Sequence, residues 1–148
     1  MPADWRSKRR IGGALLRPHL RFVDVDNAEN IQHFRSALAK QIVELDLPDC
    51  DLSAIMGPSR QLTQHLAHYI YDLTDSQGHS AFAGLRYTSR LNPQWPCWAL
   101  FEDRIRDEYQ PSISQSIMPD DEGLVAAARL FGFDIEALHG SRMMIRPL

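Results

Sequence analysis

Apolar residues recur at regular spacing in the first third of the chain, and the pattern predicts a strand followed by a helix. Between Leu20 and Val25 apolar and polar side chains alternate, which is typical of a strand with one buried face. Asp26 lies three residues before Glu29, like a carboxylate version of a capping box, and predicts a helix that runs to about Leu45. The apolar stripe of this helix consists of Ile31, Phe34, Leu38, Ile42 and Leu45.

Two more helices are predicted further along. Residues 47–58 contain proline, glycine and short polar side chains, so we expect a loop there, followed by a helix with Ser59 as its N-cap. The apolar face of that helix consists of Leu62, Leu66, Tyr69, Ile70 and Leu73. Acidic residues 120–122 favour the start of a late helix, Gly132 its C-terminal cap, and the chain from Ala137 onward is expected to fray. Its apolar face consists of Leu124, Val125, Ala128 and Phe131.

Between these helices the residues predict a pair of short strands. The first covers Gly84–Arg90 and the second Cys97–Glu102, with a turn over residues 91–96 that contains two prolines. Strands and helices do not alternate regularly along the chain. The order therefore favours an α+β fold with a mixed sheet and flanking helices, rather than a doubly wound parallel sheet.

Length and charge narrow the classes of function. A chain of 148 residues has the length of one domain, and a net charge of −3 makes nucleic acid an unexpected partner. The one basic cluster, Arg6–Arg10, fits a solvated N-terminal tail better than a nucleic-acid-binding arm. No apolar run reaches the length that spans a membrane, and the apolar run Ile11–Leu16 is too short for a signal peptide, so we expect a cytoplasmic protein. Cys50 and Cys97 show neither a disulfide framework nor the spacing of a zinc site.

The first strand of the pair carries an unusual density of polar side chains. Tyr87 and Ser89 share one face of a regular strand, where a phenol beside a hydroxyl could stack on and hydrogen-bond a planar polar group. Arg86 and Arg90 suit an anion such as a pyrophosphate, because guanidinium groups bind phosphate oxygens in pairs. This cluster is the candidate functional site, although a lone strand serine is more often an ordinary surface residue.

Other residue patterns have simpler explanations. His65 and His68 lie three positions apart on the second helix and could share a metal, but no third ligand is evident, and a solvated helix face is the favoured interpretation. Trp95 and Trp98 could stack a base, yet a role in the core or in anchoring a loop is the more common one. The chain has no phosphate-binding glycine loop and no dinucleotide fingerprint.

Five segments of the chain, in this order, resemble the C-terminal part of the RES domain family, which is named for its characteristic Arg, Glu and Ser. These segments are Leu20–Val25, Ser59–Gln64, Gly84–Arg90, Cys97–Glu102 and Ala127–Gly132. The resemblance implies a mixed sheet like that of ADP-ribosyltransferases. It also implies a toxin of a bacterial toxin–antitoxin pair that cleaves the nicotinamide–ribose bond of NAD, with water or phosphate as the acceptor.

The resemblance also assigns roles to residues. Ser89 matches the catalytic serine of the family, and Tyr87, Arg86 and Arg90 become its substrate-binding neighbours. NAD is then a substrate, and neither a separate cofactor nor a metal is expected. An antitoxin with a helix-turn-helix domain and a second copy of the chain are the expected partners. Cleavage of that bond develops oxocarbenium character, which polar groups around the ribose stabilise.

The resemblance begins near residue 20, whereas the Arg and Glu of the family lie upstream of the matched segments. We therefore expect a basic N-terminal tail over 1–19, a RES-like domain over 20–136 that is incomplete at its N-terminus, and a C-terminal tail over 137–148. In that form the active site lacks half of its groups. The alternatives are a non-enzymatic module derived from the same fold that binds an antitoxin, and an unrelated α+β interaction protein.

Overall fold

The computed structural model describes residues 3–136 and 142–143, and it shows a mixed α+β protein with small sheets and flanking helices. The chain divides into two units. The central unit comprises residues 16–108, and the terminal unit comprises residues 1–15 and 109–148. Among the described residues, no helix has the length and apolar character needed to cross a membrane.

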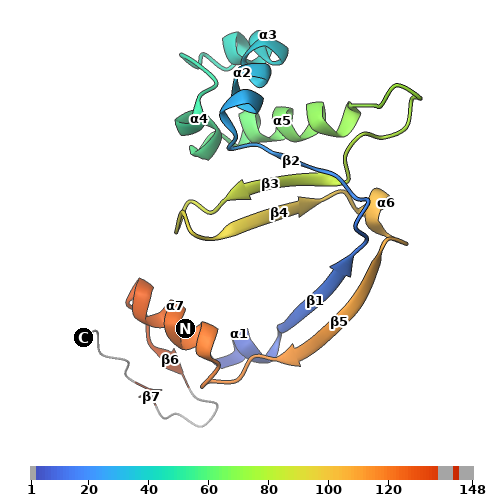
Figure 1. Cartoon of the computed structure of the whole chain (residues 1–148). Helices are drawn as coiled ribbons and strands as arrows, with labels where there is room; N and C mark the ends of the chain where they lie inside the picture. The colour runs from blue at the N-terminus through green and yellow to red at the C-terminus, as the bar shows by residue number, and fades with distance from the viewer. Residues whose placement is uncertain (1–2, 137–141, 144–148) are drawn as a thin grey trace. The chain divides into compact units, whose positions relative to one another are not determined.

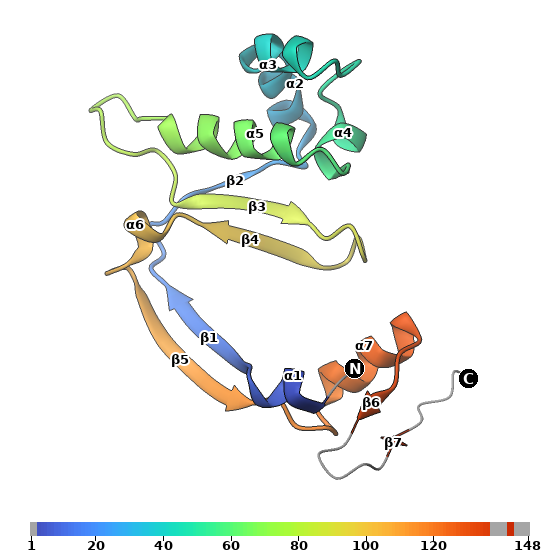
Figure 2. The ribbon, with the colours of Figure 1, turned by 180° about the vertical axis from the view of Figure 1, so that it is seen from behind.

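The central unit is built on a three-stranded sheet. Strand β2 (Phe22–Asp24) pairs in parallel with β3 (Gly84–Thr88), which pairs antiparallel with β4 (Pro96–Leu100). Helices α2 (Ala28–Ala37), α3 (Ala39–Glu44), α4 (Leu52–Met56) and α5 (Arg60–Asp72) lie on one face of this sheet (Figures 1 and 2). The short helix α6 (Glu102–Ile105) follows β4. The strand predicted over 20–25 and the strand pair are thus confirmed, each slightly shorter than expected.

The apolar stripes pack into one core in the central unit. Phe34, Leu62 and Ile70 are almost completely buried, and Val23, Val25 and Leu85 from the sheet join them. Ser59 caps α5 as predicted, since its hydroxyl oxygen accepts a hydrogen bond from the backbone N–H of Leu62 at 3.3 Å.

Three details of the helices differ from the prediction. The N-cap of α2 is Asn27, whose side chain accepts from the N–H groups of Glu29 and Asn30, and not Asp26. The expected single helix is interrupted at Leu38, where φ is −104° and ψ is 16°. The apolar spacing continues through the interruption, because Leu38 itself is buried, so the pattern could not reveal the break. The loop expected over 47–58 contains α4, capped by the carboxylate of Asp51.

The terminal unit contains elements that the sequence did not predict. Residues 1–19 were expected to form a tail, whereas α1 (Ala3–Ser7) and β1 (Arg10–Leu16) occur there, and β1 pairs with β5 (Tyr109–Ser116). Strand β1 does not alternate apolar and polar residues. In β5 Tyr109, Pro111 and Ile113 do alternate with polar residues, but every residue of the strand is exposed, so this alternation corresponds to no buried face.

The late helix of the terminal unit is confirmed. Helix α7 (Glu122–Phe131) begins after Asp121, whose carboxylate accepts the N–H of Leu124 at 2.9 Å, and it ends at Gly132 with a φ of 65°. Only a glycine adopts such a φ without strain. Strand β6 (Ile135–Glu136) pairs with β7 (Arg142–Met143). The rest of the predicted C-terminal tail, 137–141 and 144–148, lies outside the described residues.

Candidate functional site

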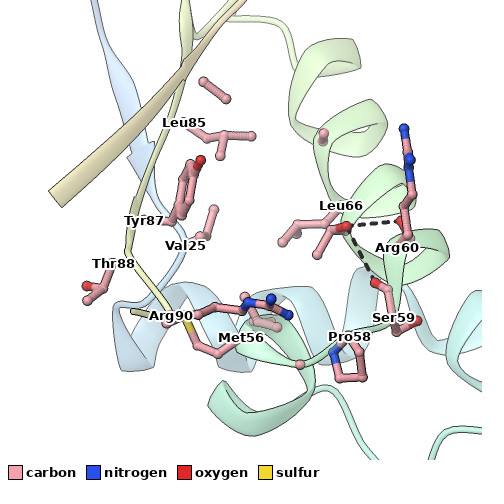
Figure 3. Close-up of a pocket in the computed structure, with 15 residues that line it drawn as sticks. Val25, Met56, Pro58, Ser59, Arg60, Leu66, Leu85, Tyr87, Thr88 and Arg90 are labelled. Carbon is pink, nitrogen blue, oxygen red and sulfur yellow. Dashed lines mark hydrogen bonds between the residues drawn. The ribbon is translucent and has the colours of Figure 1, made fainter. Parts of the chain in front are cut away.

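A cavity of about 420 Å³ lies in the central unit, between the helix-covered face of the sheet and the start of α5 (Figure 3). Its strand side is formed by Val25 of the segment after β2, by Leu85 and Tyr87 of β3, and by Ala99 of β4. Its helix side is formed by α4, by the turn of residues 57–59 and by the first turns of α5. Most of the lining is apolar, with polar groups concentrated near one end.

Tyr87 reaches the cavity because of the strand period. Val23, Leu85 and Tyr87 point to the same face of the sheet, and the first two are buried beneath the helices. Tyr87 is nearer the end of β3, where it is half-buried and keeps its ring beside Val25 (Figure 3). A phenol at the edge of an apolar pocket can pack against a ring and still reach a polar atom.

One guanidinium group brings positive charge to this cavity. Arg90 follows β3, is exposed, and extends across the cavity towards the turn before α5 (Figure 3). Arg60, the first residue of α5, also lines the cavity, but its guanidinium points away from it (Figure 3), so at this end the cavity meets the positive end of the helix dipole. No aspartate or glutamate is among the described residues that line the cavity. The local charge therefore favours an anionic ligand.

Asp26 fixes the strand end that carries these residues. Its Oδ2 accepts the backbone N–H of Thr88, a bond between positions that lie 62 residues apart. Its Oδ1 is buried and has no hydrogen-bond partner within the described part of the chain. This carboxylate, which the sequence suggested as a helix cap, instead holds β3 against the segment that follows β2.

The other residues of the predicted cluster lie elsewhere. Arg86 is on the opposite face of the sheet, where it forms an ion pair with Asp24 and lies 6.0 Å above the ring of Trp98. Ser89 is the residue after β3 and is not among the lining residues. Its Oγ accepts the N–H of Leu91 at 3.2 Å, and its own N–H donates to the carbonyl of Trp95 at 2.8 Å. The structure thus brings Tyr87 and Arg90 together at one cavity, without Arg86 and Ser89.

Four polar lining residues were not predicted as site residues. Thr88 was named only as part of the strand, Ser59 as a helix cap, and Arg60 and Thr63 only as part of the segment Ser59–Gln64 that resembles the RES family. The hydroxyl of Thr63 donates to the carbonyl oxygens of Ser59 and Arg60, so it is held on the helix (Figure 3). For the lining residues at the start of α5, the only feature of the sequence that points to a site is the turn of residues 57–59. This turn places the start of α5 across the cavity from β3.

The histidines of α5 behave as a solvated helix face. His65 and His68 are exposed, and His68 pairs with Asp72 at 3.3 Å, one helical turn further on. No group of three metal-binding side chains occurs among the residues that the structure describes. Trp98 packs edge-on against Phe22 with ring centroids 5.3 Å apart, which agrees with an anchoring role better than with free stacking.

The ionisable groups with shifted pKa values lie away from this cavity. Burial raises the pKa of the Cys50 thiol, and the neighbouring charge of Asp49 raises it further. A second cavity of about 380 Å³ in the central unit is lined by polar residues that include Arg21, Asp75 and His79. There, the backbone N–H groups of Gln77 and His79 lower the pKa of the Asp75 carboxyl. The first cavity combines a largely apolar lining with positive charge, so it is the candidate site.

Comparison with known proteins adds no constraint, since no protein-family model, curated protein or solved structure matches this chain.

Proposed function

We propose that the cavity of the central unit binds NAD, and that the chain is a RES-type toxin domain that cleaves the nicotinamide–ribose bond. The observation that carries the proposal is a convergence of segments. Four of the five segments that resemble the RES family contribute lining residues, although they are spread over about eighty positions of the sequence. If the separate segments resembled the family by chance, nothing would require them to line the same cavity, so their meeting there supports the resemblance.

The chemistry of the lining fits a dinucleotide. Arg90 supplies guanidinium donors for the pyrophosphate, and the start of α5 adds its dipole. Tyr87, Val25 and Leu85 offer an apolar and aromatic surface for a ring. The volume is at the lower end of small-molecule sites, which suits part of NAD rather than the whole molecule.

The lining residues of the cavity account for binding of NAD better than for cleavage of its nicotinamide–ribose bond. Stabilising an oxocarbenium-like transition state normally requires a carboxylate, and the described lining residues include none. In the proposal Ser89 acts at the mouth of the site. The turn that holds the Ser89 hydroxyl in the structure has to move before this residue can act.

The decisive experiment measures NAD binding by calorimetry and nicotinamide release by chromatography, both on the full chain. We expect Arg90→Ala to weaken NAD binding by about tenfold or more, as the loss of a charge-assisted bond predicts. The matched control is Arg86→Gln, which removes the same charge from the opposite face and leaves binding unchanged. Equal losses in both variants, or no NAD binding by the wild type, would contradict the proposal.

The role of Ser89 is separable from binding. Ser89→Ala is expected to lower nicotinamide release sharply while NAD affinity stays the same, because its hydroxyl is not part of the lining. An unchanged rate would remove Ser89 from the mechanism. Binding without release in the wild type would retain the site and reject the enzymatic reaction for this chain.

A second function is favoured by the uncovered face of the same sheet. Trp98 is 51% exposed and Leu100 is 40% exposed, and they lie on the side away from the helices of the central unit. Exposed aromatic and aliphatic residues in a row favour a protein partner such as an antitoxin or a second copy. Co-purification with a helix-turn-helix protein that is lost in Trp98→Ala would support this module, and monomeric elution without a partner would argue against it.

A further inference from the structure

Arg6 of α1 is the only charged residue that is buried within the described part of the chain. It is 3% exposed, and its Nη2 donates to the carbonyl oxygen of Glu136 at 2.5 Å. That bond joins positions 130 residues apart and explains how the side chain is held. It does not neutralise the charge.

The remaining surroundings of Arg6 do not compensate its charge. Among the described residues, Arg6 forms no ion pair with an aspartate or a glutamate, and its Nε has no hydrogen-bond partner. A buried cation without an anionic partner is costly, whereas a guanidinium that binds an anion through several N–H groups is stable. Nε is enclosed by protein atoms, so an anion approaches the guanidinium through Nη1, for which the described residues provide no hydrogen-bond partner.

A cavity of about 300 Å³ in the terminal unit adjoins this side chain. It is lined by Arg6–Arg10 and by residues 116–119, which follow β5. Four of these lining side chains are basic, and none is acidic. Asp4, which precedes this segment, has its carboxylate bound by the Lys8 ammonium at 2.9 Å.

The basic side chains of this cavity are partly preorganised. Arg10 donates through Nε to the hydroxyl of Ser114 and through Nη2 to its carbonyl, each at 2.9 Å. The guanidinium of Arg9 lies 4.8 Å from the centre of the Trp5 ring. Side chains that are already held in place lose less entropy when a ligand binds.

We propose that this cavity binds a small phosphate-class oxyanion, with the buried Arg6 as its central ligand and Arg9 and Lys8 at its rim. A guanidinium N–H forms a charge-assisted hydrogen bond with a phosphate oxygen, which accounts for a charged side chain kept inside the unit. The size of the cavity fits a phosphate group or a small phosphorylated molecule. The acidic net charge of the chain argues against a nucleic-acid backbone as the ligand.

This proposal is independent of the proposed NAD site. The NAD cavity is lined by residues of the central unit, and the oxyanion cavity by residues of the terminal unit only. Loss of one binding activity therefore leaves the other measurable. Arg90→Ala is expected to affect NAD alone.

The test titrates the full chain with inorganic phosphate and, at matched ionic strength, with chloride, while amide signals of residues 6–10 and 116–118 are followed by NMR. We expect saturable shifts with phosphate only. Arg6→Gln should weaken binding by about tenfold or more. Arg129→Gln, which removes an exposed charge of α7 in the same unit, should have no effect. Identical shifts with chloride, or unchanged affinity in Arg6→Gln, would overturn the proposal.

Further measurements keep the test decisive if Arg6→Gln does not fold. Arg9→Gln changes an exposed rim residue and should weaken phosphate binding several-fold with the fold intact, and unchanged affinity would contradict the proposal. ADP binding tighter than inorganic phosphate would identify a phosphorylated molecule as the ligand, and the reverse would identify free phosphate. Affinity for single-stranded RNA that rises with its length would reject a small ligand.

Discussion

Different interactions stabilise the interior of each of the two units of this chain. The central unit buries a continuous apolar core that includes Phe34, Leu62 and Ile70. In the described part of the terminal unit only Arg6, Ala128 and Ile135 are buried, and β5 is exposed throughout its length. One unit is thus organised by apolar burial, and the other by backbone pairing and polar contacts.

This difference has consequences for stability. Burial of apolar surface contributes about 25 cal/mol per Å², whereas a typical hydrogen bond contributes about 1 kcal/mol net. The central unit should therefore unfold cooperatively, and the terminal unit should open at a lower free energy. The same contrast holds for the cavities, since one is largely apolar with a guanidinium at its end and the other is lined by basic side chains.

The largest expected effect comes from truncating the core of the central unit. Leu62 is fully buried in α5, so Leu62→Ala should lower the free energy of unfolding by about 2–5 kcal/mol. Leu130→Ala in α7, where the side chain is 57% exposed, should change it by less than about 0.5 kcal/mol. Hydrogen exchange followed by mass spectrometry measures the two units separately. Equal losses in both variants would mean that the terminal unit has a comparable core.

Glycine-to-alanine changes should have opposite signs in the two units. A Cβ at Gly84 of β3 would lie 2.2 Å from the carbonyl oxygen of Ala99, so β4 would have to move. Gly84→Ala should therefore destabilise the central unit by about 1–3 kcal/mol. Gly12 of β1 has nothing within 4 Å of that position, so Gly12→Ala should be neutral or stabilising by up to about 1 kcal/mol. Urea denaturation followed by circular dichroism measures both, and destabilisation by Gly12→Ala would indicate a covered face on β1.

Sequence patterns predicted the central unit better than the terminal unit, for a physical reason. Apolar periodicity exists because one face is buried, so the apolar stripe of α5, together with its N-cap, predicted that helix, and the turn between β3 and β4 predicted the strand pair. Strands β1 and β5 bury no continuous face, and neither strand was predicted. The basic cluster at Arg6 was interpreted as a solvated tail because burial of an arginine depends on contacts with distant residues, which no local pattern reveals.

The candidate site shows the same limit. Strand alternation correctly put Tyr87 and Arg86 on opposite faces, and only the first of these lines the cavity. It could not show that the strand ends at Thr88, after which Ser89 belongs to a turn and Arg90 extends over the cavity. The contact of Asp26 with Thr88 joins two segments that are distant in sequence, and it overrides the local capping pattern.

The smallest effects should come from surface ion pairs, and these also differ between the units. In the central unit Arg35 binds Asp49 through two bonds of 2.8 and 2.6 Å, so Arg35→Gln should cost about 0.5–1 kcal/mol at low salt and less at high salt. In the terminal unit the Lys8–Asp4 pair has one bond and both side chains are more exposed, so Lys8→Gln should have a smaller effect at neutral pH.

The pH dependence of stability should show whether the Lys8–Asp4 pair forms in the folded protein. The hydrogen bond from Lys8 lowers the pKa of the Asp4 carboxyl from 3.8 in the folded state. The folded protein then binds fewer protons than the unfolded chain, so the stabilisation is present above pH 3.8 and is lost as the pH falls through the lowered pKa. NMR titration of the Asp4 carboxyl in the wild type and in Lys8→Gln measures this shift. An identical pKa in both would show that the pair does not persist in solution, and that the stability of the terminal unit depends on the buried Arg6 and on strand pairing alone.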